Sequence, residues 1–169
     1  MKKFFVFFIL FFSLWIFWCD SKEEAEKHLN DCTILWEDCY KTTTELIEKW
    51  GNNITLQEIN NTKSLCEEKL FFLNNLSAYD KDYSLINEGK NLVSLEIHFL
   101  DFLKENFSFF TLLFQELTPE NEQYSKEHQL ELTTFVEKFL KYDQEIEKQY
   151  QQVLDTKKHY IKTYQLDEK

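Results

Sequence analysis

Apolar residues recur at intervals of three and four along most of this chain, which is the spacing of one face of a helix. Only two glycines and one proline interrupt the pattern, too few for the many turns of a β-sandwich or barrel. The pattern therefore predicts an all-α protein. The expected helices cover about residues 22–50, 55–78, 82–117 and 119–162.

The ends of these helices are marked by residues that favour helix termini. Gly51 follows the first helix and can end it. Thr55 and Glu58 have the spacing of a capping box at the start of the second helix. Pro119 suits the first turn of the fourth helix, because a helix needs no backbone N–H donor there. We therefore expect short connections between long helices.

Short connections make neighbouring helices antiparallel. If the first two helices fold back on each other at Gly51, Leu46 meets Ile59 and Cys39 meets Cys66, so facing positions are apolar. The third and fourth helices give a similar series of facing apolar positions. The simplest assembly is an up-down-up-down antiparallel four-helix bundle, with an array of helical hairpins as the alternative.

The N-terminal segment differs from the rest of the chain. Lys2 and Lys3 precede an almost wholly apolar block over residues 4–19, and charged residues follow from Asp20. This layout predicts an export signal over residues 1–21, followed by one helical domain over residues 22–169. Cleavage after Ser21 and retention as a membrane anchor are both open. A block of this length spans roughly 24 Å, which is less than the ~30 Å hydrocarbon core of a bilayer.

The same segment also resembles a bacterial lipoprotein signal. Two lysines, an apolar block, Cys19 and a polar stretch follow one another as in that family of signals, although Trp18 stands where a small residue is usual. The resemblance implies that Cys19 is lipidated. All three fates place the protein outside the cytoplasm: secreted, periplasmic or anchored at the outer face of a membrane through residues 1–21.

Export makes the remaining cysteines candidates for disulfides. Cys32 and Cys39 lie about 10.5 Å apart along a helix, beyond the ~7 Å Cα limit for a disulfide. We expect Cys39 to pair with Cys66, with two buried free thiols as the alternative. Cys32 is then left as a core thiol or as a link between two chains.

The sequence contains no pattern typical of catalysis, metal ligation or cofactor binding, so we expect neither an enzyme nor a metal or cofactor site. The net charge of -11 and the absence of arginine argue against nucleic acid as a partner. Glu96 falls on the apolar face of the third helix. A buried carboxylate there would indicate a functional site, but an outward position or a contact with Lys148 is the simpler expectation.

One apolar segment exceeds what a single helical face can bury. Residues 107–114 are apolar on nearly every side of the third helix. The segment either folds over the Gly51 turn as core or forms a partner surface. We therefore expect a non-enzymatic protein that binds a protein or lipid partner; the alternatives are a coiled-coil spacer that forms homo-oligomers and, third, an enzyme. The candidate surface is Phe107, Phe109, Phe110, Leu113 and Phe114.

Overall fold

The computed structural model of the protein describes residues 2–49, 54–112 and 119–166, and only the backbone for residues 2–20, 110 and 119–122. Within these residues the structure consists of helices joined by short non-helical connections, and its β pairing is limited to an isolated bridge between Tyr79 and Asp82. The prediction of an all-α protein is thus confirmed. The helices are α1 (Lys2–Glu48), α2 (Leu56–Asn75), α3 (Ser84–Glu105), α4 (Phe107–Leu112), α5 (Pro119–Glu127) and α6 (Gln129–Thr163).

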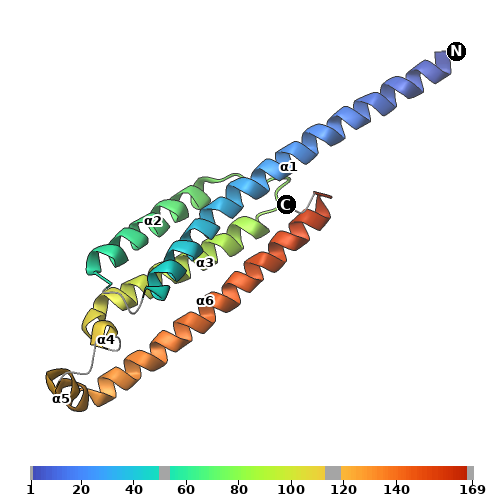
Figure 1. Ribbon diagram of the computed structural model, residues 1–169. Helices are drawn as coiled ribbons and strands as arrows, with labels where there is room; N and C mark the ends of the chain where they lie inside the picture. The colour runs from blue at the N-terminus through green and yellow to red at the C-terminus, as the bar shows by residue number, and fades with distance from the viewer. Residues whose placement is uncertain (1, 50–53, 113–118, 167–169) are drawn as a thin grey trace.

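Helix α3 has the central place among the long helices. It packs against α1, α2 and α6, whereas the backbones of α1 and α6 come close at few points and these two helices meet mainly through side chains. Figure 1 shows the long helices running in alternating directions, with α6 lying along the side of α3 opposite to α2. The core between them is apolar, and its largest fully buried side chains include Trp36, Phe99, Leu103 and Tyr160.

Helix α1 begins earlier than the sequence pattern suggests. The expected start near residue 22 is wrong, because the helix continues without a break from Lys2. Figure 1 shows its N-terminal part extending beyond the ends of the other helices. Within the described residues, no helix is both long enough and apolar enough to cross a membrane.

The start of α2 confirms the predicted capping box. The Thr55 hydroxyl accepts a hydrogen bond from the backbone N–H of Glu58 at 3.2 Å. In return, the Glu58 carboxylate accepts one from the Thr55 backbone N–H at 2.8 Å. Two N–H groups that lack helical partners are therefore satisfied, which fixes where α2 begins.

The predicted helix over residues 82–117 is wrong in extent, because α3 ends at Glu105. Both the backbone N–H and the side-chain amide of Asn106 donate to the Phe102 carbonyl, at 3.1 and 2.9 Å. An asparagine that competes in this way for helical carbonyls favours a helix end. The chain restarts as α4 at Phe107. The predicted fourth helix is likewise divided into α5 and α6 at His128.

Ion pairs and one aromatic stack connect the helices at their surfaces. Lys69 of α2 lies 2.7 Å from Asp38 of α1, and Lys157 of α6 lies 3.1 Å from Glu37 of α1. The ring of Tyr40 stacks on that of Tyr150 with centroids 3.7 Å apart. Partly exposed ion pairs of this kind each contribute little to stability, so these contacts mainly set how the helices align.

Candidate functional site

The phenylalanine segment does not form the expected exposed surface where the structure describes it. Phe107 and Phe109 are half-buried and pack against the core. The ring of Phe109 lies 6.4 Å from that of Phe135, centroid to centroid. The side chains of Phe110, Leu113 and Phe114 lie outside the described residues. For Phe107 and Phe109, the core alternative describes the packing better.

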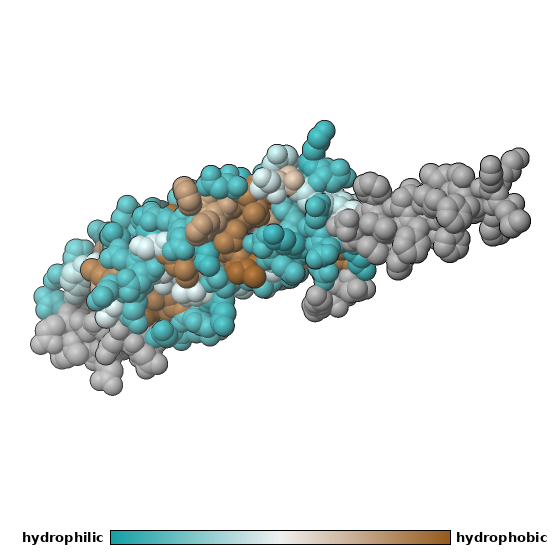
Figure 2. Space-filling view, turned by 90° about the horizontal axis from the view of Figure 1, so that it is seen from above, coloured by the Kyte–Doolittle hydropathy of each residue, from teal (hydrophilic) through white to brown (hydrophobic). Residues whose placement is uncertain are grey.

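Exposed apolar side chains are found instead on α1 and α2. Phe71 is 63% exposed, Phe72 47% and Ile34 55%. The Phe71 and Phe72 rings meet edge to face, with centroids 5.9 Å apart. Figure 2, which looks down on the molecule from above Figure 1, shows hydrophobic surface gathered on this side and bordered by hydrophilic residues.

Next to these side chains lies a shallow groove of about 360 Å³, which we call the α1–α2 groove. Aliphatic and aromatic side chains supply most of its surface, and Asp31 and Asn75 supply polar groups. A groove between two helices can receive an apolar helix from another molecule. The groove is lined by Asp31, Ile34, Leu35, Phe72, Asn75 and Leu76.

Sequence reasoning missed this groove, although the sequence carries a signal for it. Residues 70–73 are four consecutive apolar positions on a helix. One helical face can bury only part of such a run. The structure buries Leu73, half-buries Leu70 and leaves both phenylalanines exposed.

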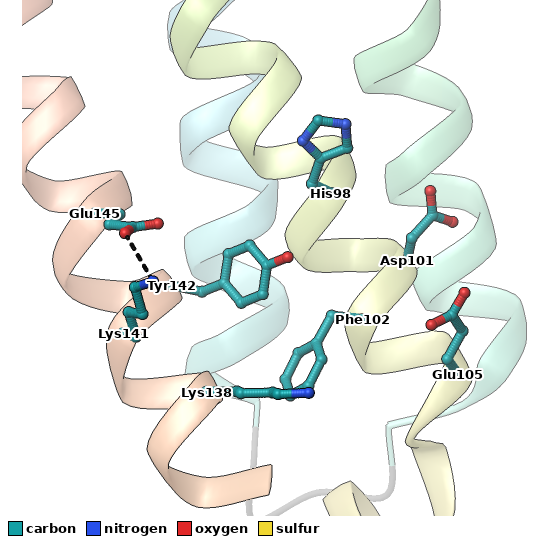
Figure 3. A pocket seen from close by; sticks show the side chains of 8 residues that line it. All are labelled: His98, Asp101, Phe102, Glu105, Lys138, Lys141, Tyr142 and Glu145. Carbon is teal, nitrogen blue, oxygen red and sulfur yellow. Dashed lines mark ion pairs between the residues drawn. The ribbon is translucent and has the colours of Figure 1, made fainter. Parts of the chain in front are cut away.

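A second groove, of about 480 Å³, lies between α3 and α6 (Figure 3). Asp101 accepts a hydrogen bond from Lys63 of α2 at 2.6 Å, and Lys141 lies 3.7 Å from Glu145. These pairs hold part of the charged lining in contacts between or along helices. The lining carries charges of both signs and favours no single ligand class. It consists of His98, Asp101, Phe102, Glu105, Lys138, Lys141, Tyr142 and Glu145.

Three buried polar groups meet where α1, α2 and α3 pack together. One sulfur atom each from Cys39 and Cys66, and one carboxylate oxygen of Glu96, all lie within 4.8 Å of one another. We call these residues the thiol–carboxyl cluster. The register of the first two helices predicted that Cys39 faces Cys66. The expected disulfide is not formed, because both residues are free thiols.

Glu96 is the unexpected member of the cluster. The expectation that it extends outward or meets Lys148 is wrong, because its side chain is 0% exposed. Neither of its carboxylate oxygens has a hydrogen-bond partner among the described residues. Burial, and then the charge of Cys66, hold the pKa of this carboxyl well above its ordinary value. Burial therefore favours the neutral form of this carboxyl group.

The two thiols of the cluster affect each other's protonation. The hydrogen bond from Cys39 to Cys66, with a further contact from Thr43 at 4.0 Å, lowers the pKa of Cys66 against the opposing effect of burial. The same hydrogen bond and burial raise the pKa of Cys39. Cys66 is thus the first of the two to lose its proton.

Cys32 lies elsewhere in the core. Its sulfur is 3.5 Å from Nε2 of His28, one helical turn earlier. Burial raises the pKa of the Cys32 thiol to about 12. A buried, protonated thiol fits the expectation of a core residue better than that of a link between two chains.

Comparison with known proteins adds no further guide to the function of these sites. No protein-family model, curated protein or solved structure matches the chain.

Proposed function

We propose that the protein acts by binding a partner protein through the α1–α2 groove, without catalysing a reaction. The observation that carries this proposal is the exposure of Ile34, Phe71 and Phe72 beside an apolar groove. Single apolar side chains scattered over a protein surface are normal and need no explanation. Apolar side chains that are grouped on a surface, in contrast, mark interaction sites. Each such ring can contribute roughly 1.5–3 kcal/mol when a partner buries it.

Charge favours a protein partner over a membrane surface. The chain has a net charge of -11, and Asp31 lies on the lining of the groove. Anionic lipid headgroups attract lysine and arginine and repel acidic surfaces. The best complement is an amphipathic helix with an apolar face flanked by basic residues, because such a helix matches both the groove and its charge.

The setting we propose is extracytoplasmic. Residues 1–21 would act as an export signal that is cleaved, retained as an anchor or lipidated at Cys19, and residues 22–169 would form an up-down-up-down bundle of the four long helices. Ile34 follows Ser21 by about 20 Å of helix. If the N-terminal segment stays attached to a membrane, the groove is therefore near that membrane, where a partner's membrane-proximal helix could reach it.

The test uses the full-length chain in mild detergent and two labelled probe peptides. Both peptides carry leucines at positions i, i+3, i+4 and i+7; one has lysines elsewhere and the other glutamates. We expect the lysine peptide to bind and the glutamate peptide to bind at least ~10-fold more weakly. Replacing Ile34 and Phe72 by serine should weaken binding of the lysine peptide ~10-fold or more.

The matched control is Leu140→Ser on α6, because Leu140 is 51% exposed but lies away from the groove. This variant should bind the lysine peptide as the unchanged chain does. The proposal would be contradicted if the groove variant and Leu140→Ser lost affinity for the lysine peptide equally, or if the unchanged chain bound neither peptide. Binding of the unchanged chain to phosphatidylcholine vesicles in place of the peptide would indicate a lipid surface. Loss of oligomers in sedimentation of the groove variant would indicate self-association.

A further inference from the structure

We propose that Cys39, Cys66 and Glu96 form a buried binding site for a thiophilic divalent cation, Zn²⁺ being the best fit. The three side chains come from three helices, and one potential ligand atom from each lies within 4.8 Å of the others. Thiolate sulfur together with a carboxylate oxygen is a ligand set that zinc accepts, whereas calcium and magnesium prefer oxygen alone.

The spacing of the three atoms is close to what a tetrahedral ion requires. With zinc–sulfur distances of about 2.3 Å and zinc–oxygen distances of about 2.1 Å, ligand atoms lie roughly 3.6–3.8 Å apart. The upper limit of 4.8 Å in this structure therefore needs a contraction of no more than about 1.2 Å. Small side-chain rotations of Glu96 and the cysteines can supply it, and the backbone helices can stay in place.

Glu96 supplies the observation that points to a cation rather than to two packed thiols. Its carboxyl group is fully buried, and both oxygens lack hydrogen-bond partners among the described residues. Buried polar groups in proteins are nearly always paired, and an ion is one of the usual partners where no protein donor is present. A divalent cation between the two sulfurs would satisfy this carboxylate.

The surroundings of the cluster suit a bound cation. The Thr43 hydroxyl lies 4.0 Å from the Cys66 sulfur and can orient that ligand, as outer hydrogen-bond partners do in metal sites. The ammonium group of Lys69, which pairs with Asp38, also acts electrostatically on Cys39. Two thiolates and a carboxylate exceed the charge of the cation by one, and Lys69 weakens the effect of that excess although it also pairs with Asp38. Three protein ligands leave the fourth position to water.

The order of residues alone does not reveal this site, because no two of its ligands are near each other in the chain. Metal motifs are recognised from fixed short spacings. Here the ligands are brought together only by the packing of α1, α2 and α3.

The test titrates the reduced full-length chain, in detergent and free of chelator, with Co²⁺ and then with Zn²⁺. Thiol counting first verifies that all four cysteines are reduced. We expect one Co²⁺ per chain with a thiolate-to-cobalt charge-transfer band, and we expect Zn²⁺ to displace it and to raise the melting temperature.

Glu96→Gln, Cys39→Ser and Cys66→Ser should each weaken Zn²⁺ binding roughly 100-fold or more, since loss of an outer partner alone costs 10–100-fold. The matched control is Cys32→Ser, which removes a buried thiol outside the cluster and should leave binding unchanged. If a cysteine variant does not fold, the near-isosteric Glu96→Gln decides. Absence of the charge-transfer band, its loss in Cys32→Ser, or undiminished Zn²⁺ affinity in Glu96→Gln would overturn the proposal.

Discussion

Gly89 of α3 lies against the indole ring of Trp36, so that a β-carbon at position 89 would be only 3.0 Å from Cδ1 of that ring. The ring is fully buried. It meets Tyr150 edge to face at 6.0 Å between centroids, and the Lys157 ammonium group lies 5.7 Å from the ring. With contacts of this kind around it, the indole has little room to withdraw. The close approach of α1 and α3 therefore depends on glycine at this position.

Replacing Gly89 by alanine should lower the free energy of unfolding, and replacing it by valine should lower it further. Overpacking of this kind typically costs about 1–3 kcal/mol, and for alanine a gain in helix propensity of up to ~1 kcal/mol offsets part of it. Urea unfolding followed by circular dichroism measures the change. Asn91→Ala, an exposed change on the same helix, is the control and should be neutral or slightly stabilising. Greater stability of Gly89→Val would show that the indole can move.

His28 should make the fold less stable in mild acid. Burial lowers the pKa of this histidine below its ordinary 6.5, although the charges of Asp31 and Asp82 act in the opposite direction. The unfolded chain therefore takes up the proton at a higher pH than the folded chain does. The free energy of unfolding contributed by this group falls as the pH drops below about 6.5.

The measurement compares urea unfolding at several pH values between 5 and 7.5 for the unchanged chain and for His28→Phe, which keeps a ring but cannot titrate. We expect the variant to lose less stability than the unchanged chain as the pH is lowered. The exposed His159 provides the control, since His159→Gln should keep the original pH dependence. A pH dependence that is the same in His28→Phe would rule out this origin.

Truncation of an exposed phenylalanine of α2 and of a half-buried phenylalanine of α4 should change the free energy of unfolding by different amounts. Phe109→Ser should lower the free energy of unfolding by about 1–3 kcal/mol, because this half-buried ring packs against the core. Phe72→Ser should change it by no more than about 0.5 kcal/mol, because about half of that side chain is already exposed to solvent. Differential scanning calorimetry of both variants checks this. If Phe72→Ser strongly lowered the free energy of unfolding and Phe109→Ser did not, Phe72 would be a core residue and the partner surface would lie on α4 instead.

The pairing of Cys39 with Cys66 stays a prediction for oxidising conditions. In oxidised glutathione with a chelator, the Cys66 thiolate attacks the glutathione disulfide and releases one glutathione thiol. Cys39 then attacks the mixed disulfide and releases the second. Because both sulfurs are buried, the reaction should require local opening and proceed slowly.

Peptide mapping after alkylation should find a Cys39–Cys66 crosslink and an unreacted Cys32. Bound Zn²⁺ should slow the crosslink if the cluster holds a cation. A crosslink that includes Cys32 would show that the register of α1 and α2 differs from the one described. The Cys32→Ser chain, which should crosslink at the same rate, controls for rearrangement of disulfides.

The sequence predicted those features that depend on neighbouring residues or on helical spacing. Thr55 and Glu58 predicted the start of α2, because a capping box needs only four residues. The facing of Cys39 and Cys66 followed from counting outward from one turn. Both inferences use local geometry, which the order of residues determines almost completely.

Other features depend on tertiary packing or on a choice between alternative hydrogen bonds, and the sequence could not predict them. Asn106 ends α3 by bonding to the Phe102 carbonyl, yet asparagine is also tolerated within helices. Glu96 is buried although a glutamate on a helix usually reaches solvent. Which of the apolar residues 70–73 stay exposed is decided by the position of α1 beside α2, a fact of tertiary packing.

The central position of α3 also determines in what order the protein can come apart. Because α6 packs mainly on α3 and meets α1 only through side chains such as Tyr150 on Tyr40, it can open as a unit while α1, α2 and α3 stay packed. Helix α3 cannot open in this way, because it packs against α1, α2 and α6 and its release would leave α6 without its main partner. Amide protons of α3 should therefore exchange with solvent only on global unfolding, while those of α6 exchange through a less costly partial opening. Protection of amide protons against exchange should therefore be lower in α6, the last long helix of the chain, than in α3.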